Sequence, residues 1–231
     1  SITNDKTVAE GTTLTIGTTS VNTNISLAAN TIINNLGTIS LNGGITGTDV
    51  TSTWINNANA VLNISGALLS TGTLDAVTSP NTVNYNGAGA QNIKVPAESY
   101  HTLMVSNAGT KSLIGNVPVD SAVSIGGAVV LEEGSYILSG DANLIMSGTT
   151  ELKMTRTTDE DVYPELRGTY SLTGGTVTIT QNGDSAVVNE GPYYNLKLNG
   201  THGYDLGAVS SIANNLDILN TAFLNNNSVL S

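Results

Sequence analysis

The chain has 231 residues, 18 acidic and seven basic side chains, a formal net charge of −11 and no cysteine. This acidic balance argues against binding to nucleic acid or to an anionic membrane surface, and the lack of cysteine excludes disulfides and thiolate metal sites. Charged residues make up only 11% of the chain, whereas 39% are hydrophobic, and no apolar run is long enough to span a membrane. With one Trp, one Phe and eight Tyr, we expect an aliphatic core.

From the N-terminus onward, a four-residue pattern recurs in which outward-facing residues alternate with apolar residues, as in a strand with one buried face. The ten copies are Thr13–Ile16, Thr38–Leu41, Val61–Ile64, Thr82–Tyr85, Thr102–Val105, Ala122–Ile125, Asn143–Met146, Thr176–Ile179, Asn195–Leu198 and Asn215–Ile218. All their apolar positions hold Leu, Ile, Val, Met or Tyr. Successive copies begin 19–25 residues apart, except for one step of 33 residues.

A repeat of about 20 residues built on short strands is typical of a stacked solenoid. Further apolar strings lie between the copies, for example Val129–Leu131 and Tyr136–Leu138, with the corner pairs Gly126-Gly127 and Glu133-Gly134 beside them. We therefore predict an all-β fold without helices, a parallel β-helix of about ten coils with three strands per coil. Its hand should be right, as parallel crossover connections prefer.

The one break in the period predicts a charged insertion around residues 147–175, extruded as a loop from a single solenoid domain spanning residues 1–231. Loops that leave a regular scaffold often carry function. Asp159, Glu160 and Asp161 are a candidate Ca²⁺ site, although they lack the spaced ligands of known calcium loops. The alternatives are a contact with a partner or a solvated excursion with no ligand.

Other candidate sites are weaker, and no catalytic residue or cofactor is predicted. Glu132 and Glu133 are adjacent in sequence, which does not suit a pair of carboxylates flanking a substrate. The outward positions of the repeated pattern carry only two charges, Lys197 and Asp217. His101 and His202 have no neighbouring ligand in the sequence, and Thr-x-Thr occurs in too few copies to form an ice-binding face.

Longer stretches repeat as well. Asn81-Thr82-Val83-Asn84-Tyr85-Asn86-Gly87-Ala88-Gly89-Ala90-Gln91-Asn92-Ile93 precedes a segment from Tyr100 that contains Asn107-Ala108-Gly109-Thr110-Lys111-Ser112-Leu113, and Thr176–Ile179 precedes Tyr193–Gly200 in a similar way. These motifs resemble the repeats of giant secreted surface proteins of Bacteroidetes, which have adhesin-like character. The resemblance implies a β-helical stalk displayed on or shed from the cell, and it brings no catalytic residue with it. Residues 201–206 depart from the family's pattern.

Together these features predict a non-enzymatic structural stalk segment of an extracellular, cell-surface fibre or adhesin. The alternative is a glycan- or cell-surface-binding module of a secreted adhesin. We expect further coils of the same polypeptide at both ends, and anchor, tip and export signal outside these residues. Partners could include other copies in a filament, because apolar Met104 and Ile145 occupy outward positions, or a cell-surface glycan or protein. No membrane insertion is expected.

Overall fold

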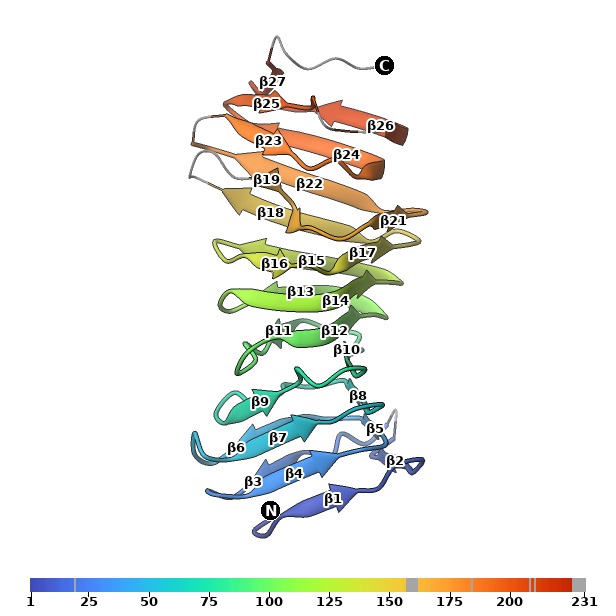
Figure 1. The fold of residues 1–231 in the computed structure, drawn as a ribbon, viewed down its shortest axis with the longest axis vertical. Coiled ribbons are helices and arrows are strands. Elements are labelled where there is room, and N and C mark those ends of the chain that lie inside the picture. The colour runs from blue at the N-terminus through green and yellow to red at the C-terminus, as the bar shows by residue number, and fades with distance from the viewer. Residues whose placement is uncertain (19, 157–161, 184, 208, 210, 226–231) are drawn as a thin grey trace.

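The computed structural model describes residues 1–231 except 19, 157–161, 184, 208, 210 and 226–231. The described chain is all-β, contains no helix, and winds upward in about ten turns from the N-terminus to the C-terminus (Figure 1). All pairings between its named strands are parallel, each strand lying on its counterpart from the preceding turn. The predicted parallel β-solenoid is therefore confirmed.

The repeated four-residue pattern forms the longest wall of the stack in its first seven copies. Thr13 is aligned with Thr38, Thr38 with Val61, and so on through Asn143. The strands of this second sheet are β2 (Thr13–Ile16), β5 (Thr38–Leu41), β8 (Val61–Ile64), β10 (Thr82–Tyr85), β12 (Tyr100–Val105), β14 (Val117–Ile125), β17 (Asn143–Met146) and β21 (Tyr170–Leu172).

The last three copies belong to a different wall. This third sheet contains β11 (Gln91–Ile93), β13 (Ala108–Leu113), β15 (Ala128–Gly134), β18 (Glu151–Arg156), β22 (Thr176–Gln181), β24 (Pro192–Gly200) and β26 (Ser211–Ile218). The pattern thus passes from one face of the solenoid to another between its seventh and eighth copies. The two faces carry the same alternation because both bury one side of each strand.

This change of face explains the irregular step, and the expectation of an extruded insertion over 147–175 is wrong for most of that segment. Leu144 is aligned with Tyr170, 26 residues later, and Leu152 with Val177, 25 residues later. The segment supplies four strands of the stack: β18, β19 (Val162–Tyr163), β20 (Glu165–Leu166) and β21. The described residues of this segment therefore belong mainly to the stack, whereas residues 157–161 lie outside the described residues.

Shorter sheets close the remaining side of each turn. The first sheet is β1 (Lys6–Val8), β4 (Ile32–Asn35), β7 (Thr53–Asn56) and β9 (Thr73–Asp75). The others are β3 (Ile25–Leu27) with β6 (Ile45–Gly47), β16 (Leu138–Gly140) with β14 and β20, and β19 with β23 (Ala186–Val188), β25 (Gly203–Asp205) and β27 (Phe223–Leu224).

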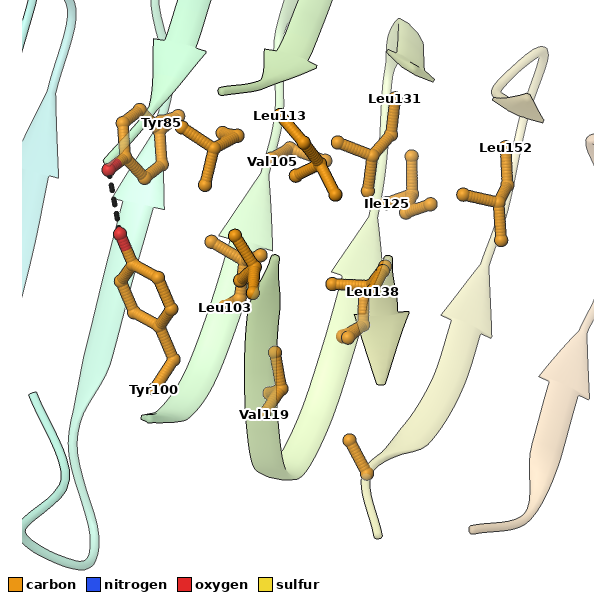
Figure 2. Packing of buried hydrophobic residues seen from close by; sticks show 14 of the residues in the cluster. Tyr85, Tyr100, Leu103, Val105, Leu113, Val119, Ile125, Leu131, Leu138 and Leu152 are labelled. Atoms are coloured by element: carbon orange, nitrogen blue, oxygen red, sulfur yellow. Dashed lines mark hydrogen bonds between the residues drawn. The ribbon is translucent and has the colours of Figure 1, made fainter. Parts of the chain in front are cut away.

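The core is one continuous column of apolar side chains inside the turns. Every apolar residue of the repeated pattern from Ile39 to Leu198 is buried, whereas Leu14 and Ile218, in the first and last copies, are each 39% exposed. A solenoid turn is covered only by its neighbours, and among the described strands these outer copies pair with a turn on one side only. In Figure 2, Leu103 and Val105 of β12, Leu131 of β15 and Leu152 of β18 project into this column.

Most of the buried hydrophobic residues are aliphatic, as expected, but tyrosines are more prominent among them than the composition suggested. Tyr85, Tyr100, Tyr163, Tyr193 and Tyr204 are among the largest fully buried side chains, as is the single tryptophan. A buried tyrosine needs a partner for its hydroxyl. Partners are available at the corners of the solenoid, where backbone N–H and C=O groups are not paired in the parallel ladders.

The hydroxyls of Tyr85 and Tyr100 lie 2.9 Å apart and hold one such corner (Figure 2). Tyr100 donates to the carbonyl of Lys94 at 2.6 Å, and Tyr85 accepts from the amide of the same residue at 2.9 Å. The two rings come from neighbouring turns, so their hydroxyls tie those turns together. Tyr204 repeats the arrangement higher in the stack, accepting from the amide of Gln181 at 2.9 Å.

The motifs that resemble the surface-protein repeats also close corners. Lys111 is fully buried, and its ammonium group donates to the carbonyls of Gly87, Gly89 and Ala108 at 2.7, 2.7 and 3.0 Å. Two of these carbonyls belong to the preceding corner, whose conformation the lysine thereby fixes. Burial lowers the pKa of Lys111 because water no longer solvates the ammonium group.

Gln91 occupies the aligned position one turn earlier and has a similar role. Its side-chain amide donates to the carbonyls of Ile64 and Gly66 at 3.0 and 2.8 Å, and its carbonyl accepts from the amide of Gly87 at 2.8 Å. A long polar side chain at this position therefore replaces a missing backbone partner in two successive corners.

Candidate functional site

The predicted calcium ligands Asp159, Glu160 and Asp161 lie outside the described residues. Within the described residues, no three His, Asp or Glu side chains are grouped so that they could hold a metal ion. His101 contacts the hydroxyl of Thr102 at 3.2 Å, and His202 contacts that of Thr201 at 2.8 Å. Each histidine thus has a local partner from its own strand or corner.

Glu132 and Glu133 face opposite sides of β15. Glu133 is 1% exposed and accepts a hydrogen bond from the amide of Leu138, whereas Glu132 lies on the outer face. This arrangement follows from strand alternation. The two carboxyl groups do not face a common site.

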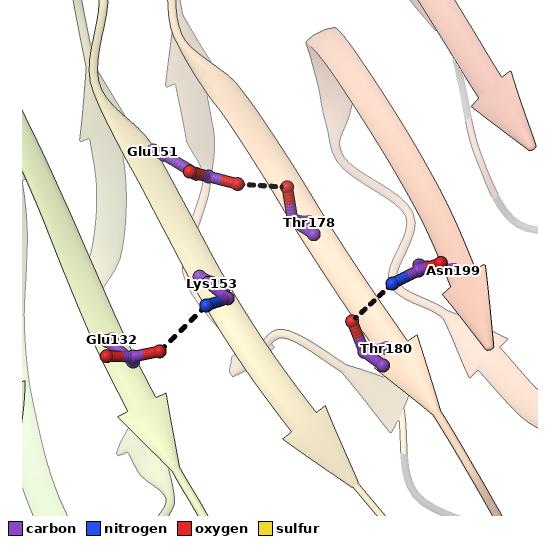
Figure 3. Close-up of polar contacts among 6 residues, drawn as sticks. All are labelled: Glu132, Glu151, Lys153, Thr178, Thr180 and Asn199. Atoms are coloured by element: carbon purple, nitrogen blue, oxygen red, sulfur yellow. Dashed lines mark hydrogen bonds and ion pairs between the residues drawn. The ribbon is translucent and has the colours of Figure 1, made fainter. Parts of the chain in front are cut away.

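The outer face of the third sheet collects charges that the sequence pattern placed on separate turns (Figure 3). Glu132 and Lys153 form an ion pair at 2.8 Å between β15 and β18, and this contact raises the pKa of Lys153. Lys197 and Asp217 are aligned on β24 and β26. Opposite charges on neighbouring strands favour one alignment of the strands, although an exposed pair contributes only modestly to stability.

Hydroxyl and amide groups continue the same face. Thr178 donates to Glu151 at 2.5 Å, and Asn199 donates to Thr180 at 3.4 Å (Figure 3). These side chains are engaged with one another along the stack axis. The face is therefore a set of contacts between turns, and none of its charged groups is held in a recess where it would meet a substrate.

A hollow of about 800 Å³ lies on another side, among β16, β19, β20 and β23. We call it the charged recess. It is lined by Ser139, Pro164, Glu165, Arg167, Asn189 and Glu190, among others. Arg167 and Glu190 are exposed, and neither side chain has a hydrogen bond or ion pair to a described residue.

The side chain of Asn189 connects the segments that form one wall of the charged recess. Its amide nitrogen donates to the carbonyls of Pro164 and Leu166, both at 2.9 Å, and to the hydroxyl of Tyr170 at 3.0 Å. The ring of Tyr170 packs edge-on against Tyr193, with centroids 5.9 Å apart. Asn189 is therefore used in holding the wall, and the charged groups available to a ligand include the guanidinium of Arg167 and the carboxylate of Glu190.

The sequence interpretation covered Glu165 and Arg167 only as part of the charged segment 147–175, and it missed Asn189 and Glu190. A local signal existed, because Asn189-Glu190 stands directly before Gly191-Pro192, where a strand cannot continue unbroken. The alignment of β20 with β16 that brings these groups together is not visible in the sequence.

Among the outward apolar residues, Ile145 is 41% exposed and Met104 is half-buried. They lie on one wall but two turns apart, with Ser124 between them. The described residues include no helix long and apolar enough to cross a membrane. Comparisons with protein-family models, curated proteins and solved structures found no match for this chain.

Proposed function

We propose that this chain is a structural stalk segment of an extracellular, cell-surface fibre or adhesin, without catalytic activity of its own. The observation that carries the proposal is the continuity of the parallel ladders along the whole described stack. About ten turns at a spacing of roughly 4.8 Å make a stiff body some 48 Å long. Such a body separates whatever lies at its two ends.

Three further features support this role. The buried side chains of Lys111 and Gln91 hydrogen-bond to backbone carbonyls of the preceding turn, and such contacts between turns suit a scaffold. The same residues carry the resemblance to giant secreted surface proteins of Bacteroidetes, in which such repeats build stalks. The low content of charged residues fits a repetitive extracellular surface rather than an active site.

The proposal is tested by immunogold electron microscopy of the source cells, with an antibody raised against the chain. We expect gold particles along thin fibres outside the cell envelope. Labelling confined to the cytoplasm, or to compact particles without elongation, would contradict the proposal.

A second candidate role is that of a binding module that recognises a glycan or another cell-surface partner. The charged recess favours it, because Arg167 and Glu190 have no described partner there. If the chain has this role, beads coated with it should adhere to cells, and replacing Arg167 and Glu190 with alanine should abolish that adhesion. The same replacement should leave the fibres unchanged.

A further inference from the structure

A second hollow, of about 500 Å³, follows the outside of the lower turns where the strands of the second sheet end. We call it the neutral groove. Its polar lining comes from successive turns and consists of Thr15, Thr18, Ser40, Asn42, Ser65, Asn86 and Asn107. The groove therefore runs along the stack axis rather than around one turn.

Backbone hydrogen bonds show that the residues of the groove are stacked. The amide of Asn42 donates to the carbonyl of Ile16, that of Ser65 to Leu41, and that of Asn86 to Ile64, at 2.8, 3.1 and 3.0 Å. Each polar side chain thus recurs one turn above the last. The spacing between turns is about 4.8 Å.

Gly17, Leu41 and Ala88 complete the lining of the groove. Its polar side chains are hydroxyls and amides, and no ionisable side chain lines it. Over residues 11–93 the only charged residues are Asp49 and Asp75, and neither lines the groove.

The groove does not satisfy its own hydrogen bonds. The hydroxyl of Ser65 donates to the side-chain oxygen of Asn42 at 2.8 Å, but the side-chain nitrogen of Asn42 and the side-chain oxygen of Asn86 are buried without a hydrogen-bond partner among the described residues. An unpaired buried amide is unfavourable. Both residues line the groove, so its wall contains two polar groups that no described residue satisfies.

We propose that the neutral groove binds an uncharged polysaccharide, whose chain lies along the stack axis. Alternating donors and acceptors suit sugar hydroxyls, and an extended pyranose chain repeats at nearly the spacing of the turns. An anionic chain would find no cation there, a metal ion would find no carboxylate, and a protein partner would find no apolar anchor. This inference rests on the binding role above, and its failure leaves the stalk role untouched.

Affinity electrophoresis of the whole chain tests the proposal, in gels that contain hydroxyethyl cellulose, galactomannan or dextran, with polygalacturonate as the acidic comparison. We expect retardation in at least one neutral gel. Ala88→Leu should weaken that binding by about tenfold or more, because Ala88 is exposed and lines the groove. The added side chain fills the groove and offers no hydrogen bond.

Ala90→Leu is the matched control, since Ala90 is exposed in the same corner but is not among the lining residues. It should bind as the unmodified chain does, and both variants should melt at the temperature of the unmodified chain. Three results would overturn the proposal: no retardation in any neutral gel, retardation only in polygalacturonate, or equal binding by Ala88→Leu.

Discussion

At the scale of single residues, a few long polar side chains hold the corners that the strand ladders leave open. Lys111 satisfies three carbonyls at once, and the Tyr85–Tyr100 pair satisfies both backbone groups of Lys94. Each of these side chains is buried, so its hydrogen bonds have no water to replace them. Their loss should therefore be felt in global stability.

Lys111→Met should lower the free energy of unfolding by roughly 1–3 kcal/mol, because it leaves three carbonyls without their donor. Denaturant titration followed by circular dichroism measures the change. Lys197→Met is the control, since Lys197 is half-buried on an outer face and has no hydrogen bond to a described residue through its ammonium group. Equal effects of the two substitutions would show that the buried hydrogen bonds of Lys111 contribute nothing specific to the free energy of unfolding.

The buried tyrosines predict loss of stability in alkali. Burial raises the pKa of Tyr85, Tyr100, Tyr170, Tyr193 and Tyr204 above the ordinary value near 10. Above that pH the unfolded chain releases these protons and the folded chain keeps them, so stability falls as pH rises, by up to about 1.4 kcal/mol per unit for each tyrosine. The lowered pKa values of Lys94 and Lys111 act in the opposite direction, but only two groups contribute.

Ultraviolet absorbance of tyrosinate and circular dichroism, recorded together from pH 9 to 13, check this prediction. Most of the tyrosinate signal should appear together with unfolding. Full ionisation of all tyrosines near pH 10 in a chain that keeps its β-structure would contradict it.

At the scale of strands and corners, glycine decides where a turn can bend tightly against the turn below it. Gly127 has a φ of +81°, and a Cβ placed on it would lie 2.3 Å from the carbonyl oxygen of Asn107. The adjacent Gly126 has neither restriction, since a Cβ placed on it would have no atom within 4 Å beyond its chain neighbours. Two neighbouring glycines of one corner therefore have different requirements.

Gly127→Ala should destabilise the chain by about 2 kcal/mol or more, through both the left-handed backbone and the clash. Gly126→Ala should be neutral or stabilising by up to about 1 kcal/mol, because alanine restricts the unfolded chain. Thermal melts of the two variants, side by side, measure the difference. Similar melting temperatures would mean that the corner relaxes freely.

The sequence predicted the strands well because a period of two is specific to a strand with one buried face, as in Leu103 and Val105. It did not predict the change of wall between Asn143 and Thr176, because both walls bury the same kind of side chain in the same alternation. In the sequence, the long step therefore has the same appearance as a loop. The neutral groove was missed for a related reason: Asn42, Ser65 and Asn86 each follow a strand as ordinary turn residues, and only the stacking of turns places them together.

At the scale of the whole molecule, the stack behaves as a chain of similar units in contact with their neighbours. Deleting residues 103–122 removes one turn and joins Thr102 to Val123. Because Thr102 is aligned with Ala122, the residue before Val123, the deletion keeps the register of the strand. The deletion should give a folded solenoid shorter by roughly 4.8 Å. Small-angle X-ray scattering measures the length, and circular dichroism the fold. A chain that loses its β-structure would show that the turns are not interchangeable units.

The direction of the ladders has a mechanical consequence. Since each strand pairs with the turn below, the hydrogen bonds point along the axis of the stack, and a pull on the two ends of the chain opens one boundary bond by bond from the corner where the force enters. When that boundary opens, it releases a turn of about 20 to 26 residues, which is roughly 70–90 Å of extended chain. The solenoid is some 48 Å long when folded, but its unfolded chain can extend to many times that length. Turns that open one after another would release this length in steps as the tension rises.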